Sequence, residues 1–102
     1  MRRVEENTPL EKRLLGTVSV DSGQIFMCDP CYLLPDSGTG ITMDESSYTT
    51  ICDATCSTKG AGPVFRNLAV AFSTGADGGY KVFGYYLAGH RSPRRIEIEI
   101  GG

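Results

Sequence analysis

The C-terminal third of the chain constrains the fold most, because its hydrophobic residues alternate with small or charged ones between glycine-rich turns. A period of two is typical of strands with one buried face. The pattern covers residues 68–73, 80–87 and 94–100. We expect these stretches to form one continuous antiparallel meander, with a hairpin turn at residues 75–79. Its expected core side chains are Val70, Phe72, Ile96 and Ile98, whereas Glu97 and Glu99 face water or a partner.

The stretch 80–87 is apolar on both faces, which predicts a central strand or one that lies under a partner. Residues 17–20 and 24–28 predict two more strands around a turn at 21–23, and residues 48–52 predict a short strand after a long loop over 36–47. Turn signals recur at roughly 8 to 12 residues, as in sandwiches and barrels. The sequence therefore predicts an all-β fold, a single-domain antiparallel β-sandwich or small open barrel.

The N-terminal residues favour a short helix. Thr8 precedes Pro9 and lies three residues before Glu11, the arrangement of a capping box with proline at the first helical position. We expect this helix to end at Gly16. The predicted organisation is an N-terminal arm and short helix over residues 1–16 and a single β domain over residues 17–102.

Composition narrows the classes of function. A chain of 102 residues, 40% hydrophobic, has the size and makeup of one ordinary domain. Its net charge of −2 creates no basic field, so DNA and RNA are not expected partners. The N-terminus lacks the apolar core of a secretory signal, and no apolar run is long enough to span a membrane. We expect a cytoplasmic protein without a membrane partner.

The four cysteines form two tight pairs, Cys28 with Cys31 and Cys52 with Cys56. Paired cysteines at such spacing can give zinc four soft ligands. An aspartate follows the first cysteine of each pair, however, and adds negative charge beside the thiolates. The sequence favours small buried or half-buried cysteines at strand ends and no cofactor, with zinc at all four as the alternative.

Two enzymatic interpretations are less favoured. A redox dithiol at Cys28 and Cys31 needs a following helix that lowers a thiol pKa, and Pro35 leaves no room for a useful one. A small hydrolase would need Asp21, Asp29 and Cys31 gathered at one end of the sandwich, around a pocket with a perturbed carboxylate or thiol. Turn aspartates more often accept hydrogen bonds from nearby backbone. We therefore assign no catalytic residue.

A basic turn near the C-terminus is the clearest binding candidate. Arg91, Arg94 and Arg95 cluster beside His90, the only histidine, and two tyrosines lie just before them. Such a set suits a small nucleotide or an acidic protein surface, although a solvated turn has the same composition. The candidate binding residues are Asp21, Asp29, Tyr32, Asp77, Tyr85, His90, Arg91 and Arg94.

Three motifs occur in order: Val-Asp-Ser-Gly-Gln at 20–24, Asp-Pro-Cys-Tyr at 29–32, and Ser-Thr-Gly-Ala-Asp-Gly at 73–78 followed by Tyr-Lys-Val at 80–82. Together they resemble a family of small, uncharacterised β-rich proteins of bacteria and their phages, over about residues 17–100. Cys31 and Cys52 match the family pattern, Cys28 and Cys56 do not, and Ala76 stands where glycine is usual. The resemblance implies a phage or mobile-element setting, in which small acidic domains bind host proteins or small nucleotides.

These observations predict a non-enzymatic binding module. We expect a phage or mobile-element protein, in the cytoplasm of a bacterial host, that inhibits a host defence or housekeeping protein by binding it or a small nucleotide. The alternatives that the residues leave open are the small hydrolase and the structural zinc module.

Overall fold

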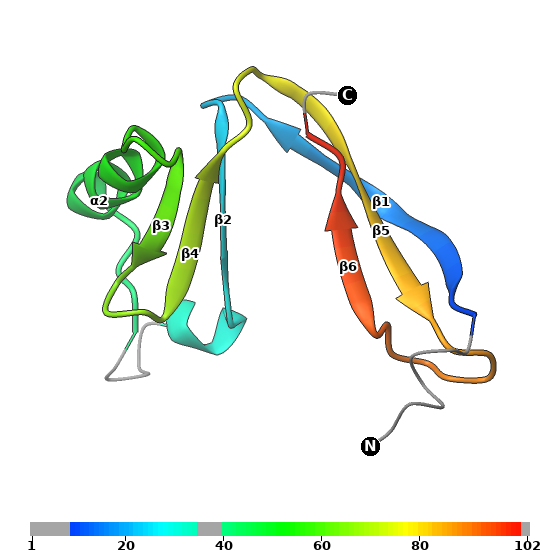
Figure 1. Ribbon diagram of the computed structural model, residues 1–102. Helices are drawn as coiled ribbons and strands as arrows, with labels where there is room; N and C mark the ends of the chain where they lie inside the picture. The colour runs from blue at the N-terminus through cyan, green and yellow to red at the C-terminus, as the bar shows by residue number, and fades with distance from the viewer. Residues whose placement is uncertain (1–8, 35–39, 101–102) are drawn as a thin grey trace. The chain divides into compact units, whose positions relative to one another are not determined.

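The computed structural model describes residues 9–34 and 40–100 (Figure 1). Its elements are, in chain order, β1 (Glu11–Val20), β2 (Gln24–Cys28), the 3-10 helix η1 (Pro30–Leu33), α2 (Glu45–Thr55), β3 (Ala61–Val64), β4 (Ala69–Ser73), β5 (Gly78–Tyr86) and β6 (Arg95–Ile98). The chain divides into two compact units. Unit 1 comprises Met1–Ser19 and Gly78–Gly102, and unit 2 comprises Val20–Asp77.

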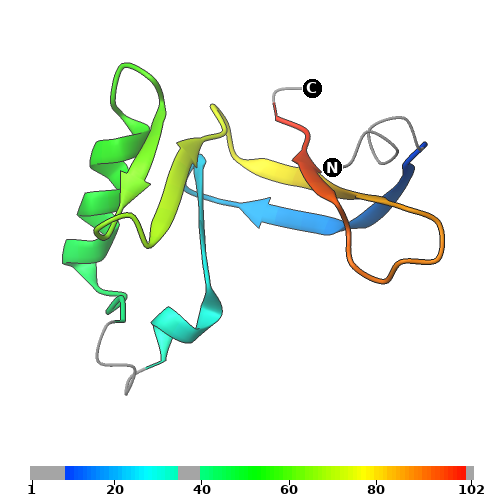
Figure 2. The ribbon, with the colours of Figure 1, turned by 60° about the horizontal axis from the view of Figure 1, so that its bottom comes forward.

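Unit 2 is a three-stranded antiparallel sheet with one helix on it. The strand order is β2-β4-β3, and Ala71 of β4 lies opposite both Phe26 and Gly62. Helix α2 packs along one face of the sheet, as Figures 1 and 2 both show. The buried core lies between helix and sheet and consists of Ile41, Ile51, Val64, Ala69 and Ala71. This single apolar layer is what holds the unit together.

Helix α2 replaces the predicted loop and short strand over residues 44–52. Asp44 begins it as N-cap, because its carboxylate accepts a hydrogen bond from the backbone N–H of Ser47 at 3.0 Å. Thr49 and Thr50 favour strands in isolation, yet each hydroxyl donates to the carbonyl four residues earlier. Burial of Ile51, 4% exposed, outweighs those local preferences. Residues 36–39 of the predicted loop lie outside the described residues.

Unit 1 is a second three-stranded antiparallel sheet, in the order β1-β5-β6. Strand β5 is central, as its two apolar faces predict. Phe83 lies opposite Glu97, and Gly84 lies opposite Ile96. The period of two gives the sheet a polar face with Phe83, Tyr85, Arg95 and Glu97, and an apolar face with Val82, Tyr86, Ile96 and Ile98.

The predicted N-terminal helix does not form. Residues 11–16 belong to β1, a ten-residue strand, while Thr8 and the arm before it lie outside the described residues. The local capping signal is overridden because β1 pairs along β5, which gives its backbone groups partners that one or two helical turns would not provide. Across the pair, Arg13 lies over the ring of Tyr86 at 4.3 Å.

The predicted meander is also wrong in its first half. Strand β4 pairs with β2 and β3, whereas β5 pairs with β1 and β6, so residues 74–77 link two sheets and make no hairpin. Val70 and Ile96, expected in the core, are 50% and 44% exposed. The helix covers the opposite face of β4, which carries Ala69 and Ala71. The prediction of a mostly antiparallel β chain is confirmed, but neither sheet closes into a barrel.

Candidate functional site

The four cysteines do not come together. Cys28 ends β2, whereas Cys52 on α2 accepts a hydrogen bond from the side-chain amide of Gln24 at 3.3 Å, at the other end of that strand. The four residue steps from Gln24 to Cys28 separate those ends by about 13 Å. None of the described residues form a group of three or more His, Cys, Asp or Glu side chains that could hold a metal ion. All four thiols are free, and Cys31 and Cys56 are exposed.

The segment from Asp29 to Cys31 forms the N-terminal cap of the 3-10 helix η1. Asp29 is the N-cap of η1, and its carboxylate accepts a hydrogen bond from the backbone N–H of Cys31 at 2.9 Å. A side-chain hydrogen bond to the same carboxylate raises the pKa of the Cys31 thiol, and partial desolvation and the charge of Asp29 raise it further. A raised pKa leaves less thiolate at neutral pH, which works against a nucleophilic or redox role for Cys31.

The candidate aspartates lie at opposite ends of the unit 2 sheet. Asp21 precedes β2, and Asp77 lies near the same turn, since a Cβ on Gly23 would stand 3.9 Å from the Asp77 carboxylate. Asp29 follows β2, together with Tyr32, whose N–H donates to the Asp29 carbonyl at 3.0 Å. Strand β2, which lies between Asp21 and Asp29, spans about 13 Å from its first to its last residue. The structure therefore does not assemble Asp21, Asp29 and Cys31 into the reaction centre of a hydrolase.

The basic turn over residues 88–94 connects β5 to β6. His90 and Arg91 are exposed there, and the N–H of Arg94 donates to the carbonyl of Tyr85 at 2.6 Å. The Tyr85 side chain is already engaged, because its hydroxyl donates to Glu97 at 2.9 Å and Arg95 lies over its ring at 4.1 Å. The Tyr85 side chain therefore links β5 to β6, and Arg95 covers one face of its ring.

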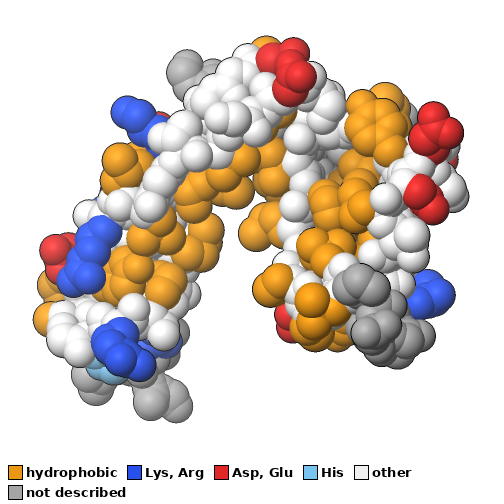
Figure 3. Space-filling model, turned by 180° about the vertical axis from the view of Figure 1, so that it is seen from behind, with side chains coloured by type: hydrophobic (Ala, Val, Ile, Leu, Met, Phe, Trp, Pro, Cys, Tyr) orange, Lys and Arg blue, Asp and Glu red, His pale blue; other side chains and the backbone are white. Residues whose placement is uncertain are grey.

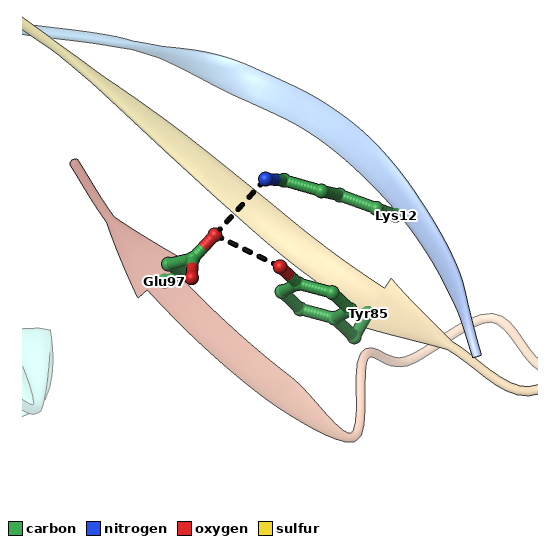
Figure 4. Close-up of polar contacts among 3 residues, drawn as sticks. All are labelled: Lys12, Tyr85 and Glu97. Atoms are coloured by element: carbon green, nitrogen blue, oxygen red, sulfur yellow. Dashed lines mark hydrogen bonds and ion pairs between the residues drawn. The ribbon is translucent and has the colours of Figure 1, made fainter. Parts of the chain in front are cut away.

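Three strands meet in a polar cluster that sequence reasoning missed. Lys12 of β1 lies 3.2 Å from the Glu97 carboxylate of β6, which also accepts the hydrogen bond from Tyr85 of β5 (Figure 4). Lys12 also lies 4.3 Å above the ring of Phe83. The Tyr85 hydrogen bond and then Lys12 lower the pKa of Glu97, and Glu97 raises the pKa of Lys12. The cluster ties both edge strands to β5, and only the strand register reveals it.

A small cavity of about 300 Å³ opens beside the start of α2. It is lined by Ile41, Thr42, Ser47, Thr50, Phe65 and Arg66, among others. Two of its hydroxyls take part in the start of the helix: that of Ser47 bonds to the Thr42 carbonyl and to Asp44, and that of Thr50 donates to the Ser46 carbonyl. These hydrogen bonds stabilise the N-terminus of α2, so we assign the cavity no binding role.

The open sheet face of unit 2 is unusual because its side chains are apolar, although α2 does not cover them. We define this open face by the residues of β2, β3 and β4 that point away from α2, which are Ile25, Met27, Ala61, Pro63, Val70 and Phe72. Met27 and Val70 are about half exposed, at 49% and 50%. Figure 3 shows hydrophobic side chains at the surface of both units. Apolar residues on both faces of β2 and β4 were the available sequence signal.

The two units differ in formal charge. Unit 1 has eight Lys and Arg against five Asp and Glu, and unit 2 has two against seven, which gives formal charges of +3 and −5. The net charge of −2 hides this difference.

No family model, no curated protein and no solved structure matches the chain. No helix within the described ranges is long and apolar enough to cross a membrane.

Proposed function

We propose that this chain is a non-enzymatic binding module that binds another protein through the open face of unit 2. The observation that carries the proposal is the composition of that face. Strands β2, β3 and β4 contain no charged residue, and the six side chains of the open face are all apolar. An antiparallel sheet with a helix on one side normally turns polar residues to the other. An apolar face in that position marks an interaction surface.

The chemistry of the open face suits a protein partner. The buried centres of protein interfaces are poor in charged residues and rich in methionine and aromatic side chains, which Met27 and Phe72 supply here. Met27 lies opposite Val70, and Ile25 lies opposite Phe72, so the apolar side chains form contiguous cross-strand pairs. A flat patch of this kind fits a complementary apolar protein surface better than a small polar molecule.

The resemblance to small phage and bacterial proteins supports a host protein as the partner. In this proposal, binding inhibits that protein, for example a defence protein of the bacterial cytoplasm. A small nucleotide receives less support, because the Tyr85 hydroxyl and ring are occupied by Glu97 and Arg95. The placement of Asp21 and Asp29 at opposite ends of β2 gives no support to the hydrolase.

The test compares capture from bacterial lysate by three forms of the full chain: wild type, Val70→Glu, and Tyr48→Glu as a control. Tyr48 is as exposed as Val70, at 51%, but lies on α2. We expect one or more proteins to be retained by wild type and Tyr48→Glu and lost with Val70→Glu. Once purified, a captured protein should bind wild type and Tyr48→Glu with similar affinity and Val70→Glu more weakly. Equal capture by wild type and Val70→Glu, or loss only with Tyr48→Glu, would overturn the proposal.

A further inference from the structure

Strand β6 offers an open edge. Among the described strands it pairs with β5 alone, at the end of the order β1-β5-β6. The N–H of Glu99 donates to the carbonyl of Lys81, so the hydrogen-bonded pairs with β5 fall at Glu99, Glu97 and Arg95. The backbone N–H and C=O groups of Ile96 and Ile98 therefore point away from β5. An edge with such unsatisfied groups is a template for another strand.

The residues of this edge are complementary to themselves. The segment reads Arg95-Ile96-Glu97-Ile98-Glu99, with positive charge at its start and negative charge at its end. Antiparallel pairing with an identical segment, centred on Glu97, places each Ile96 opposite Ile98 of the second copy. It also places each Arg95 opposite Glu99 of the second copy, and opposite charges on directly facing residues stabilise strand pairs.

Glu97 faces Glu97 of the second copy at the centre of this arrangement. Like charges there would oppose pairing, but each carboxylate already lies 3.2 Å from Lys12 and accepts the hydrogen bond from Tyr85. Two glutamates and two lysines then meet with no net charge. The polar cluster of unit 1 thus neutralises the one unfavourable position of the pairing.

We propose that two copies of this chain pair through β6, antiparallel and centred on Glu97, into one six-stranded sheet. The contact is isologous, since each copy presents the same edge. It also extends the apolar row of Ile96 and Ile100, which are 44% and 41% exposed, across the two-fold axis. A short strand pair buries less than the ~800 Å² per partner of a stable interface, so the dimer is weak, with a dissociation constant on the order of 0.1 mM.

The first experiment follows self-association of the full chain by sedimentation and by amide NMR shifts, from about 0.01 to about 1 mM, around the expected dissociation constant. We expect concentration-dependent shifts at the amides of Ile96 and Ile98. Association should weaken at high salt, because the Arg95 and Glu99 pairs are exposed. Lys59→Glu and Val70→Glu, both in unit 2, should leave it unchanged. A chain that stays monomeric at about 1 mM, or whose shifts lie elsewhere, overturns the proposal.

Charge reversal provides the sharper test. Arg95→Glu and Glu99→Arg should each lower the association constant roughly tenfold or more, because two attractive pairs become repulsive. The double variant R95E/E99R should restore it. Mixing the two single variants should give a heterodimer, since a glutamate of one chain then faces an arginine of the other at both ends of the strand pair. Folded single variants that associate like wild type, or a double variant and a mixture that both stay monomeric, would refute pairing in this register. Because Val70→Glu affects only the proposed binding face, failure here leaves that proposal standing.

Discussion

The two units carry sheets of equal strand number that are held together in different ways. In unit 2, helix α2 covers one sheet face, and the buried cluster of the described chain lies entirely there. In unit 1, ion pairs and cations over aromatic rings link β1, β5 and β6. Nine of the ten β1 residues are exposed. The strands of the two units have similar alternating sequences, yet those of unit 2 pack into a hydrophobic layer and those of unit 1 are linked by polar and aromatic side chains.

The comparison teaches where sensitivity to substitution should lie. A hydrophobic layer loses much when a buried side chain is changed, because cavities and unpaired charges have no compensation. Exposed ion pairs contribute little singly, since water and salt screen them. We therefore expect the largest effects in unit 2 and smaller, condition-dependent effects in unit 1.

The largest expected effect comes from Ala71→Asp. Ala71 is 0% exposed and lies under α2, so an aspartate there buries an unpaired charge and costs about 3 kcal/mol or more of the free energy of unfolding. Its neighbour Val70, on the open face, provides the control, and Val70→Asp should cost less than about 1 kcal/mol. Urea unfolding measures both. Equal losses of unfolding free energy in the two variants would contradict the assignment of Ala71 to the buried face of β4 and Val70 to its open face.

The next effect is in unit 1, at Gly84. A Cβ on Gly84 would stand 3.0 Å from the Tyr86 ring and 3.2 Å from both Leu15 and Pro93, so Gly84→Ala should cost about 1 to 3 kcal/mol by overpacking. Gly16 on β1 has nothing within 4 Å of the same position. Gly16→Ala should be neutral or stabilise by up to about 1 kcal/mol, through the unfolded state. Thermal unfolding of the pair tests whether β1 and β5 pack as described.

A moderate effect is expected at the start of α2. Asp44→Ala removes the N-cap hydrogen bond to Ser47 and should cost about 1 kcal/mol. Asp53, exposed near the end of the same helix, is the matched control, and Asp53→Ala should be silent or slightly stabilising. Amide hydrogen exchange across α2 is the readout. Faster exchange with Asp53→Ala than with Asp44→Ala would contradict the cap.

The smallest effect is a pH dependence of unit 1. The pKa of Glu97 in the folded chain lies below its ordinary value of 4.5, because the Tyr85 hydroxyl and Lys12 stabilise the carboxylate. Its stabilising contribution is present above pH 4.5 and is lost as the pH falls through the lowered pKa. As the pH falls below 4.5 and through the lowered pKa of Glu97, amide hydrogen exchange in β5 and β6 should therefore become faster relative to that in α2. Glu97→Gln should remove this acid-dependent difference, and an unchanged difference would exclude Glu97 as its cause.

Local sequence signals predicted several elements well. The strand over 24–28, a strand within the predicted range 94–100, the central position of β5 and the turn at Gly23, with its φ of +70°, are all confirmed. Each depends on residues near in sequence: alternation, two apolar faces, or a glycine where positive φ is needed. The signal for α2 was also present, in Asp44 followed by Glu45, but its turn-forming residues and β-branched threonines were interpreted as a loop and a strand.

Among the candidate site residues, the sequence placed the basic turn correctly but not the relations between distant groups. It grouped Asp21 with Asp29 and Cys31, although an extended strand separates them. It set Glu97 facing water or a partner, and the Glu97 side chain is indeed 42% exposed, but alternation did not predict its bonds to Lys12 and Tyr85. The open face of unit 2 was missed because Val70 and Phe72 were assigned to the core, and alternation alone does not say which face a helix covers.

The sequence by itself determined that this chain is mostly antiparallel strand, where several turns fall, and which residue types recur on each strand face. Only the tertiary structure decided which strands pair, that β1 is not a helix, and that α2 covers the face with Ala69 and Ala71. The physical reason is the range of the interactions. Turns and alternation arise from neighbouring residues, whereas strand pairing and burial depend on contacts between residues far apart, whose free energy exceeds local preference.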